Sequence, residues 1–214
     1  MLKGAIVGLG NAAMHGHLPS WLSRDDVEIV AVADISPARR AAWAARSPNA
    51  RWYDSAEALL ADVEVDFVDI CTPPSSHAAL TRAALKRGRH VLCEKPLVGS
   101  LEELRALAAL AAETGHVLHT VHNWHHAPIV RRTSELIAEG AIGQVTHAAW
   151  QTLRTRPAGA VEDGPNWRLD PLIAGGGVLT DHGWHVCYLV HRWVGAAPTA
   201  LSARLETRRH TRSE

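Results

Sequence analysis

Lys95 is the residue of this chain whose type and setting best suit proton chemistry. The chain contains three lysines against nineteen arginines. An arginine guanidinium stays protonated at any accessible pH, whereas burial or neighbours can shift a lysine amine until it exchanges protons near neutrality. The apolar run 90–93 is followed directly by Glu94, Lys95 and Pro96. We therefore predict a functional amine at this point, the alternative being a solvated turn ahead of a helix.

Asp181 and His185 form a second candidate for chemistry. They are four residues apart, a spacing that puts carboxylate and imidazole on the same face of a helical turn. A carboxylate in that place can orient the imidazole and stabilise its charge, as a general base requires. Three glycines at 175–177 precede the pair and allow close approach of the backbone to a ligand. A purely structural Asp-His contact is the alternative.

A glycine-rich turn follows the first predicted strand. Gly8 permits a tight turn, Gly10 lets the backbone approach a pyrophosphate, and the small Ala13 allows close packing of helix on strand. Backbone amides at the helix start, around Asn11 and Ala12, then face the anion. The turn predicts a dinucleotide site, the alternative being an ordinary connection between strand and helix.

Asp34 bears on which dinucleotide is bound. It follows the predicted strand 27–33, where a carboxylate can accept both ribose hydroxyls of an adenosine and would repel a 2′-phosphate. This predicts NAD as the cofactor. Arg39 and Arg40 come shortly afterwards, and a guanidinium there could swing back to a 2′-phosphate, so NADP is the alternative.

Strand and helix patterns alternate as far as residue 121, which predicts an α/β fold with a parallel sheet and helices on both faces. The predicted strands are 4–7, 27–33, 66–71, 90–93 and 117–121, and the predicted helices include a segment to about residue 21, 78–87, and 101–113 between Ser100 and Gly115. Ligands of such sheets bind at the carboxyl ends of the strands. The expected cofactor contacts there include Thr72, Pro73, His77, Glu94 and Lys95.

The pattern changes after residue 122, which predicts a second domain of α+β type over 123–214. Its expected elements are helix 129–139, strand 144–153, an irregular stretch 154–170, helix 183–194 and strand 199–207. Trp124 and Trp167 lie in predicted loops, where a substrate ring could stack on them, with Arg168 as a further substrate contact. Asn123, at the domain boundary, is a candidate cofactor contact.

Composition narrows the class of partner. Hydrophobic residues make up 47%, charged residues 21%, and the formal net charge is zero, which disfavours nucleic acid and anionic membrane and favours small molecules. No apolar run approaches the roughly 18 residues of a spanning helix, and no basic leader precedes the first strand. Cys71, Cys93 and Cys187 are odd in number and lie in apolar runs, which predicts buried, reduced thiols and a cytoplasmic protein.

The fourteen histidines raise the question of a metal site. Several crowd the segment 119–126, with His182 and His185 farther along the chain. Zinc needs three or four converging ligands, and the cysteines lack the close paired spacing that would support such a site. We therefore predict no metal, although a metal-dependent hydrolase built on the histidines is an alternative function.

With these motifs in order, the chain resembles the glucose-fructose oxidoreductase, inositol dehydrogenase and MocA family of nicotinamide-dependent oxidoreductases. The matching segments are the 8–13 turn, the 72–77 loop, Glu94-Lys95-Pro96 and the 175–185 segment. The resemblance implies a doubly wound Rossmann domain over 1–122. It also implies an NAD(P)-dependent dehydrogenase acting on a secondary alcohol or ketone of a sugar, cyclitol or related polyol.

The same resemblance assigns roles to the candidate residues. Lys95 would contact the nicotinamide ribose and the substrate hydroxyl, Asp181 would bind or orient substrate, and His185 would be the general acid or base. The Lys-Pro bond of the family is often cis, which Pro96 permits here. We expect a homo-oligomer, either a dimer or a tetramer.

The C-terminal part departs from the family pattern, because relatives continue into an open sheet that walls the substrate site. We expect a truncated sheet in this chain. Two strands alone are marginal, and an uncovered edge invites pairing with another chain. A dinucleotide-binding sensor or regulator of the same fold, without turnover, is therefore the alternative function.

Overall fold

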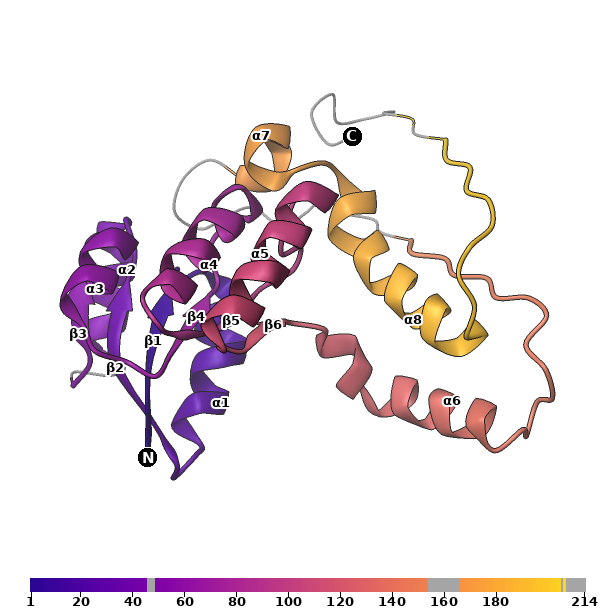
Figure 1. Ribbon diagram of the computed structural model, residues 1–214, viewed down its shortest axis with the longest axis horizontal. Coiled ribbons are helices and arrows are strands. Elements are labelled where there is room, and N and C mark those ends of the chain that lie inside the picture. The colour runs from indigo at the N-terminus through magenta and orange to yellow at the C-terminus, as the bar shows by residue number, and fades with distance from the viewer. Residues whose placement is uncertain (46–48, 154–165, 205, 207–214) are drawn as a thin grey trace. The chain divides into compact units, whose positions relative to one another are not determined.

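The computed structural model describes residues 1–45, 49–153, 166–204 and 206 (Figure 1). They fall into two units, one over Met1–Val121 and the other from His122 onward. None of the described helices combines the length and apolar character needed to cross a bilayer.

The first unit is built on one parallel sheet of six strands in the order β3-β2-β1-β4-β5-β6 (Figure 1). The strands are β1 (Leu2–Val7), β2 (Val27–Ala33), β3 (Arg51–Tyr53), β4 (Phe67–Ile70), β5 (His90–Cys93) and β6 (Leu118–Thr120). This is the strand order of a doubly wound dinucleotide-binding fold, so the α/β prediction is confirmed. All strands are parallel, and the order in which they are added along the chain reverses between β1 and β4. Ligands of such folds bind at this switch point.

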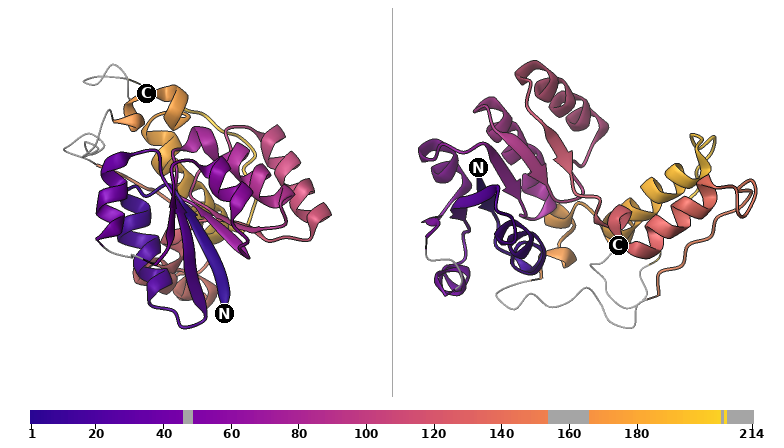
Figure 2. Two further views of the ribbon diagram at one scale, coloured as in Figure 1. Left: turned by 90° about the vertical axis from the view of Figure 1, so that its left-hand side faces the viewer. Right: turned by 90° about the horizontal axis from the view of Figure 1, so that it is seen from below.

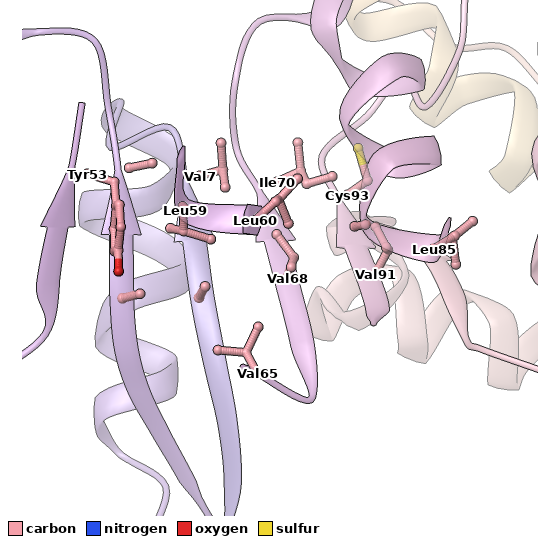
Figure 3. Close-up of a cluster of buried hydrophobic side chains, with 14 of the residues drawn as sticks. Val7, Tyr53, Leu59, Leu60, Val65, Val68, Ile70, Leu85, Val91 and Cys93 are labelled. Atoms are coloured by element: carbon pink, nitrogen blue, oxygen red, sulfur yellow. The ribbon is translucent and has the colours of Figure 1, made fainter. Parts of the chain in front are cut away.

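Helices cover both faces of the sheet (Figure 2), because the strands bury apolar side chains on both sides. Along β1, Ala5 and Val7 belong to one apolar cluster and Ile6 to the other, as the two-residue period of a strand requires. One cluster, shown in Figure 3, packs against α3 (Ala56–Asp62), α4 (His77–Lys86) and α5 (Leu101–Thr114). The other packs against η1 (Ala13–His17), α1 (Leu18–Leu22) and α2 (Pro37–Ala44). Each fully buried aliphatic side chain contributes about 1.5–3 kcal/mol.

Local signals set the helix ends. Ser36, Ser55 and Ser100 each accept a hydrogen bond from a backbone amide in the first turn of α2, α3 and α5. Gly115 ends α5 with φ at 69°. The predicted roles of Ser100 and Gly115 are therefore confirmed, whereas β3 was missed because it is only three residues long.

All the regular secondary structure described in the second unit is helical. Its helices are η3 (Asn123–His126), α6 (Pro128–Ala138), η4 (Trp167–Leu169), α7 (Pro171–Ala174), η5 (Leu179–Gly183) and α8 (Trp184–Val194). The α6 and α8 helices lie side by side (Figures 1 and 2), and the indole of Trp193 donates a hydrogen bond to the Ser134 hydroxyl at 2.9 Å. The helices predicted at 129–139 and 183–194 are confirmed.

Two predicted strands are wrong where the structure describes them. No strand forms over 144–153, or in the part of 199–207 that is described, residues 205 and 207 lying outside it. An extended segment becomes a strand only when a neighbour pairs with its N–H and C=O groups. Among the described residues of the second unit, neither segment has such a neighbour.

All three cysteines are free thiols. Cys71 and Cys93 are buried, as predicted, but Cys187 is exposed on α8. The prediction of a buried thiol is wrong for Cys187 because helical periodicity turns this position away from the apolar stripe that includes the buried Leu189.

Candidate functional site

The glycine-rich turn lies at the carboxyl end of β1, and its two glycines do different things. Gly8 has φ at 89°, and a Cβ added there would lie 2.8 Å from the Cys71 carbonyl carbon and the Thr72 nitrogen. A Cβ added at Gly10 would meet nothing within 4 Å. Asn11 and Ala12, which open the helix, are exposed. The turn thus leaves the open approach at Gly10 that a pyrophosphate needs.

Paired substitutions separate these two roles. Gly8→Ala is expected to lower the free energy of unfolding by about 1–3 kcal/mol, because of its positive φ and the backbone contacts. Gly10→Ala should change that free energy by less than about 0.5 kcal/mol, yet weaken NADH binding at least tenfold. Urea unfolding and NADH fluorescence measure the two effects. Wild-type NADH affinity in Gly10→Ala would show that the pyrophosphate does not approach this glycine.

Asp34 joins the tip of β2 to the glycine-rich turn. Its carboxylate accepts hydrogen bonds from the Leu9 amide at 2.6 Å and from the Ser36 amide at 2.8 Å. Each carboxylate oxygen keeps a further lone pair that can accept a ribose hydroxyl. Arg39 lies nearby in the first turn of α2, where its amide donates to the Ser36 hydroxyl at 3.4 Å. Asp34 is therefore tied to the glycine-rich turn, and cofactor binding by Asp34 and Arg39 stays a prediction.

The loop after β4 packs on the buried side chain of His77. The Ser76 hydroxyl lies 2.6 Å from the Thr72 hydroxyl and 2.8 Å from the Pro73 carbonyl oxygen. The His77 ring is 1% exposed, and its nitrogens lie 2.7 Å from the carbonyl oxygens of Thr72 and Pro96. We predicted a cofactor contact for His77, but its ring is buried under the loop. It supports the residues that would make such contacts.

The Glu94-Lys95-Pro96 segment leaves the carboxyl end of β5, at the same edge of the sheet as the glycine-rich turn and the loop of Thr72. The Lys95-Pro96 peptide bond is cis, as the resemblance implied. Glu94 accepts a hydrogen bond from the Lys95 amide at 3.0 Å, and both side chains are partly exposed. The predicted cofactor contacts of the first unit thus gather at one edge.

A buried polar cluster at this edge was missed by the sequence analysis. Asp69 is fully buried on β4, yet its carboxylate lies 2.9 Å from His17 Nδ1 and accepts a hydrogen bond from the Trp21 indole at 2.7 Å. His17 Nε2 lies 3.1 Å from a Glu94 carboxylate oxygen. A carboxylate within an otherwise apolar buried strand needs partners, and that was the signal in the sequence that could have found the cluster.

Charge explains how the cluster is stabilised. Burial opposes a charge on His17, but hydrogen bonds to Asp69 and Glu94 and their negative charges outweigh it and raise the pKa of the ring to about 10. Burial alone would raise the pKa of Glu94, yet its hydrogen bond to His17 and the charge of that ring lower it. The cluster is therefore an imidazolium between two carboxylates.

Cys71 completes the one group of described residues that brings three metal-ligating atoms within 4.8 Å of one another, the others being His17 and Asp69. Both ring nitrogens of His17 already face carboxylates, and burial raises the pKa of the Cys71 thiol well above its usual range. Thiolate and neutral imidazole are the forms that bind zinc. The cluster is better explained as a hydrogen-bonded network.

The second unit holds the other predicted catalytic residues. His185 is 3% exposed at the start of α8, with Nδ1 3.0 Å from the Tyr188 hydroxyl and its ring stacked on Trp124 at a centroid distance of 4.2 Å. On η5, an Asp181 carboxylate oxygen lies 3.5 Å from His182 Nε2. The pairing of Asp181 with His185 stays a prediction, and Tyr188 is a partner that the sequence analysis missed.

The remaining predicted contacts lie in short helices of the second unit. Trp124 stacks on His185 and also on Trp150. The Arg168 guanidinium lies 4.2 Å from the centre of the Trp167 ring, a cation–π contact within η4. Asn123 is exposed at the start of η3. Binding of substrate or cofactor by these residues stays a prediction.

Comparison with known proteins adds two family matches. The model of an oxidoreductase family with an NAD-binding Rossmann fold (GFO/IDH/MocA) matches residues 2–122. The model of the C-terminal domain of the same family matches residues 130–214. The first match covers the unit built on the parallel sheet, and the second covers nearly all of the remainder.

Two of the relatives are named as sugar dehydrogenases. D-glucoside 3-dehydrogenase of Escherichia coli (strain K12) is 32% identical over 187 residues, which cover 86% of this chain and 52% of the relative. D-xylose 1-dehydrogenase (NADP(+)) 2 of Haloferax volcanii is 33% identical over 205 residues, covering 95% of this chain and 60% of the relative. The solved structure of GenD2 from gentamicin A biosynthesis in complex with NAD matches with a TM-score of 0.75 at 32% identity. The matched region covers 91% of this chain and 54% of the GenD2 chain.

The chain thus spans little more than half the length of the relatives that it matches. The glycine-rich turn and the Glu94-Lys95-Pro96 segment, which carry the family resemblance, belong to a sheet with the strand order of a dinucleotide-binding fold. Together with the two family matches, these features establish that the chain belongs to the GFO/IDH/MocA family of oxidoreductases.

Proposed function

We propose that this protein is an NAD(P)-dependent dehydrogenase that acts on a secondary alcohol or ketone of a sugar, cyclitol or related polyol. The observation that carries the proposal is the gathering of Gly10, Asp34, Thr72 and Lys95 at one edge of the sheet. That edge is where doubly wound folds bind dinucleotides. The names of two relatives, D-glucoside 3-dehydrogenase and D-xylose 1-dehydrogenase (NADP(+)) 2, support the substrate class.

NAD is the cofactor that we propose, with NADP as the alternative. The Asp34 carboxylate, held between the Leu9 and Ser36 amides, suits two ribose hydroxyls and would repel a 2′-phosphate. Arg39 is the residue through which NADP could be accommodated. The open approach at Gly10 would receive the pyrophosphate, and the 72–73 and 94–95 segments would face the nicotinamide half.

When bound, the dinucleotide accepts or supplies hydride, and the residues of this chain handle the proton and the charge. In oxidation, His185 would take the hydroxyl proton and Asp181 would stabilise the resulting imidazolium. Because the Tyr188 hydroxyl faces Nδ1, Nε2 is the nitrogen that we assign to this exchange. Lys95 would stabilise the negative charge that develops on the substrate oxygen. In reduction, the proton returns from His185.

Titration with NADH and NADPH, followed by a polyol and keto-sugar panel, tests the proposal. We expect saturable binding of NADH, weaker binding of NADPH, and turnover of at least one substrate class. Binding without turnover on a broad panel would instead identify the sensor that shares this fold. Stoichiometric zinc without dinucleotide binding would identify a metal-dependent hydrolase.

Lys95→Met is expected to lower kcat about a hundredfold, because it removes the ammonium from the proposed site of charge development. Steady-state kinetics at saturating dinucleotide measures the loss. Lys86→Met is the matched control, since Lys86 is exposed at the end of α4 and its loss should leave kcat within twofold. Equal kcat in Lys95→Met and the wild type would contradict the mechanism.

Two further expectations concern the state of the protein. Leu153, Leu172 and Leu201 of the second unit are about nine-tenths exposed, at 91%, 88% and 87%, which supports a homo-oligomer because exposed apolar surface favours association. Sedimentation velocity would distinguish a dimer or tetramer from a monomer.

The three free thiols support a reducing, cytoplasmic location.

A further inference from the structure

We propose that His17 and His77 are positioning residues that hold the Glu94-Lys95-Pro96 segment from two sides, and so place the Lys95 amine. The inference rests on the proposed function for its consequence in catalysis. Neither histidine would touch substrate. His17 binds the side chain of Glu94, His77 binds the backbone of Pro96, and Lys95 lies between these two anchored residues.

His17 supplies the first anchor, from an element distant in sequence. It ends the π-helical turn η1 that follows the glycine-rich turn, and its Nε2 reaches Glu94 at 3.1 Å. Its Nδ1 is fixed by both carboxylate oxygens of Asp69, at 2.9 and 3.0 Å, and Asp69 is fully buried. Wider π-helical turns often occur at functional sites. Glu94 is therefore tied through one ring to the buried centre of the sheet.

The second anchor is the buried ring of His77. Its two nitrogens lie 2.7 Å from the Pro96 and Thr72 carbonyl oxygens. Carbonyl oxygens only accept hydrogen bonds and a neutral imidazole has one N–H, so the ring donates to one of these oxygens and packs against the other. His77 thus joins the loop after β4 to the segment after β5. Displacement of the Pro96 backbone would break one of these contacts in a place that water does not reach.

The His17 ring lies between two carboxylates, so a neutral side chain in its place would not hold them together as well. Asp69 approaches from β4, Glu94 from the end of β5, and the Cys71 thiol lies 3.4 Å from Nδ1. Lys95 is the next charged residue beyond Glu94, and its charge helps to lower the pKa of that carboxyl. Removing the imidazolium would leave two carboxylates in partly buried surroundings without the cation between them. Their repulsion would move Glu94, and Lys95 with it.

The lysine content of the chain gives a direct test that needs neither dinucleotide nor turnover. Protein labelled with 13C-lysine has three Cε signals, from Lys3, Lys86 and Lys95, which Lys→Arg variants assign. In His17→Gln we expect the Lys95 signal to shift or broaden while the other two stay in place. His15→Gln is the matched control, because His15 lies two residues away on η1 and is exposed. An unchanged Lys95 signal in His17→Gln would overturn the proposal.

Kinetics and a wild-type spectrum complete the test. In His17→Gln we expect kcat to fall about tenfold, since a small misplacement of a reacting group is costly, with NADH affinity within twofold of the wild type. A loss of NADH binding with unchanged kcat would contradict positioning of Lys95. Should His17→Gln fail to fold, 15N-histidine spectra of the wild type test the proposal instead. A neutral His17 ring at pH 7 would contradict the role of its charge in holding Glu94. A chain without turnover would refute the proposed function but leave both spectra interpretable.

Discussion

Replacing His185 by asparagine is expected to lower kcat by about 10²–10⁴, because asparagine can donate a hydrogen bond but cannot exchange a proton near neutrality. The ring is nearly buried, stacked on Trp124 and in contact with Tyr188, so its orientation is restricted before substrate arrives. NADH affinity should stay within twofold, since all the predicted dinucleotide contacts except Asn123 belong to the first unit. Single-turnover hydride transfer, followed by NADH absorbance, measures the effect.

His191→Asn is the control for this experiment. It makes the same substitution on the same helix, α8, at an exposed position, and should leave kcat within twofold. If His185→Asn and His191→Asn retain equal turnover, proton transfer must be assigned to another group. If the His185 variant loses NADH affinity in the same proportion as kcat, its role is structural.

Asp69→Asn is expected to lower the free energy of unfolding by about 3 kcal/mol, the largest stability effect that we predict. Asp69 is fully buried, and its charge balances part of the His17 imidazolium. Breaking a buried pair leaves the partner without compensation in a medium that solvates it poorly. Urea unfolding at pH 6 measures the loss. Asp66→Asn, at the exposed position immediately before the same strand, should cost less than about 1 kcal/mol.

The pH dependence of the urea unfolding experiment shows which charged group causes the loss of stability in Asp69→Asn. The folded-state pKa of His17 is about 10 and its ordinary value is 6.5. The charged ring therefore contributes its full share to the free energy of unfolding below pH 6.5, and this contribution is lost as the pH rises through about 10. The lowered pKa of Glu94 acts in the opposite direction, since its contribution is present above the ordinary value of 4.5 and lost as the pH falls below it. The difference between wild type and Asp69→Asn should therefore narrow above pH 9. A constant difference from pH 6 to pH 10 would contradict the imidazolium.

Much of the first unit could be predicted from sequence because its signals are local. Apolar runs ended by Gly8, Asp34 or Glu94 marked strands, and the strand-helix alternation fixed a parallel sheet whose carboxyl ends share one edge. The 51–53 strand escaped because three residues carry too little pattern, although two of them are aromatic.

The polar cluster and the second unit could not be predicted in the same way. Asp69, His17 and Glu94 come from three elements, and only the assembled sheet brings them together. Segment 144–153 has the composition of a strand, but a strand is completed by its neighbour, which local pattern does not reveal. Tyr188 was missed because the spacing of Asp181 and His185 drew attention to a carboxylate partner.

The His17 contacts also bear on the order in which the protein folds. They join His17 to residues 52 and 77 positions later in the chain. Contacts between such distant residues carry a large loop-closure entropy and form slowly, whereas helix α5 and its caps need only local contacts. The contacts that position Lys95 should therefore form late in folding, after β1, β4 and β5 have paired. A folding intermediate with native helix content would then still lack a competent dinucleotide edge.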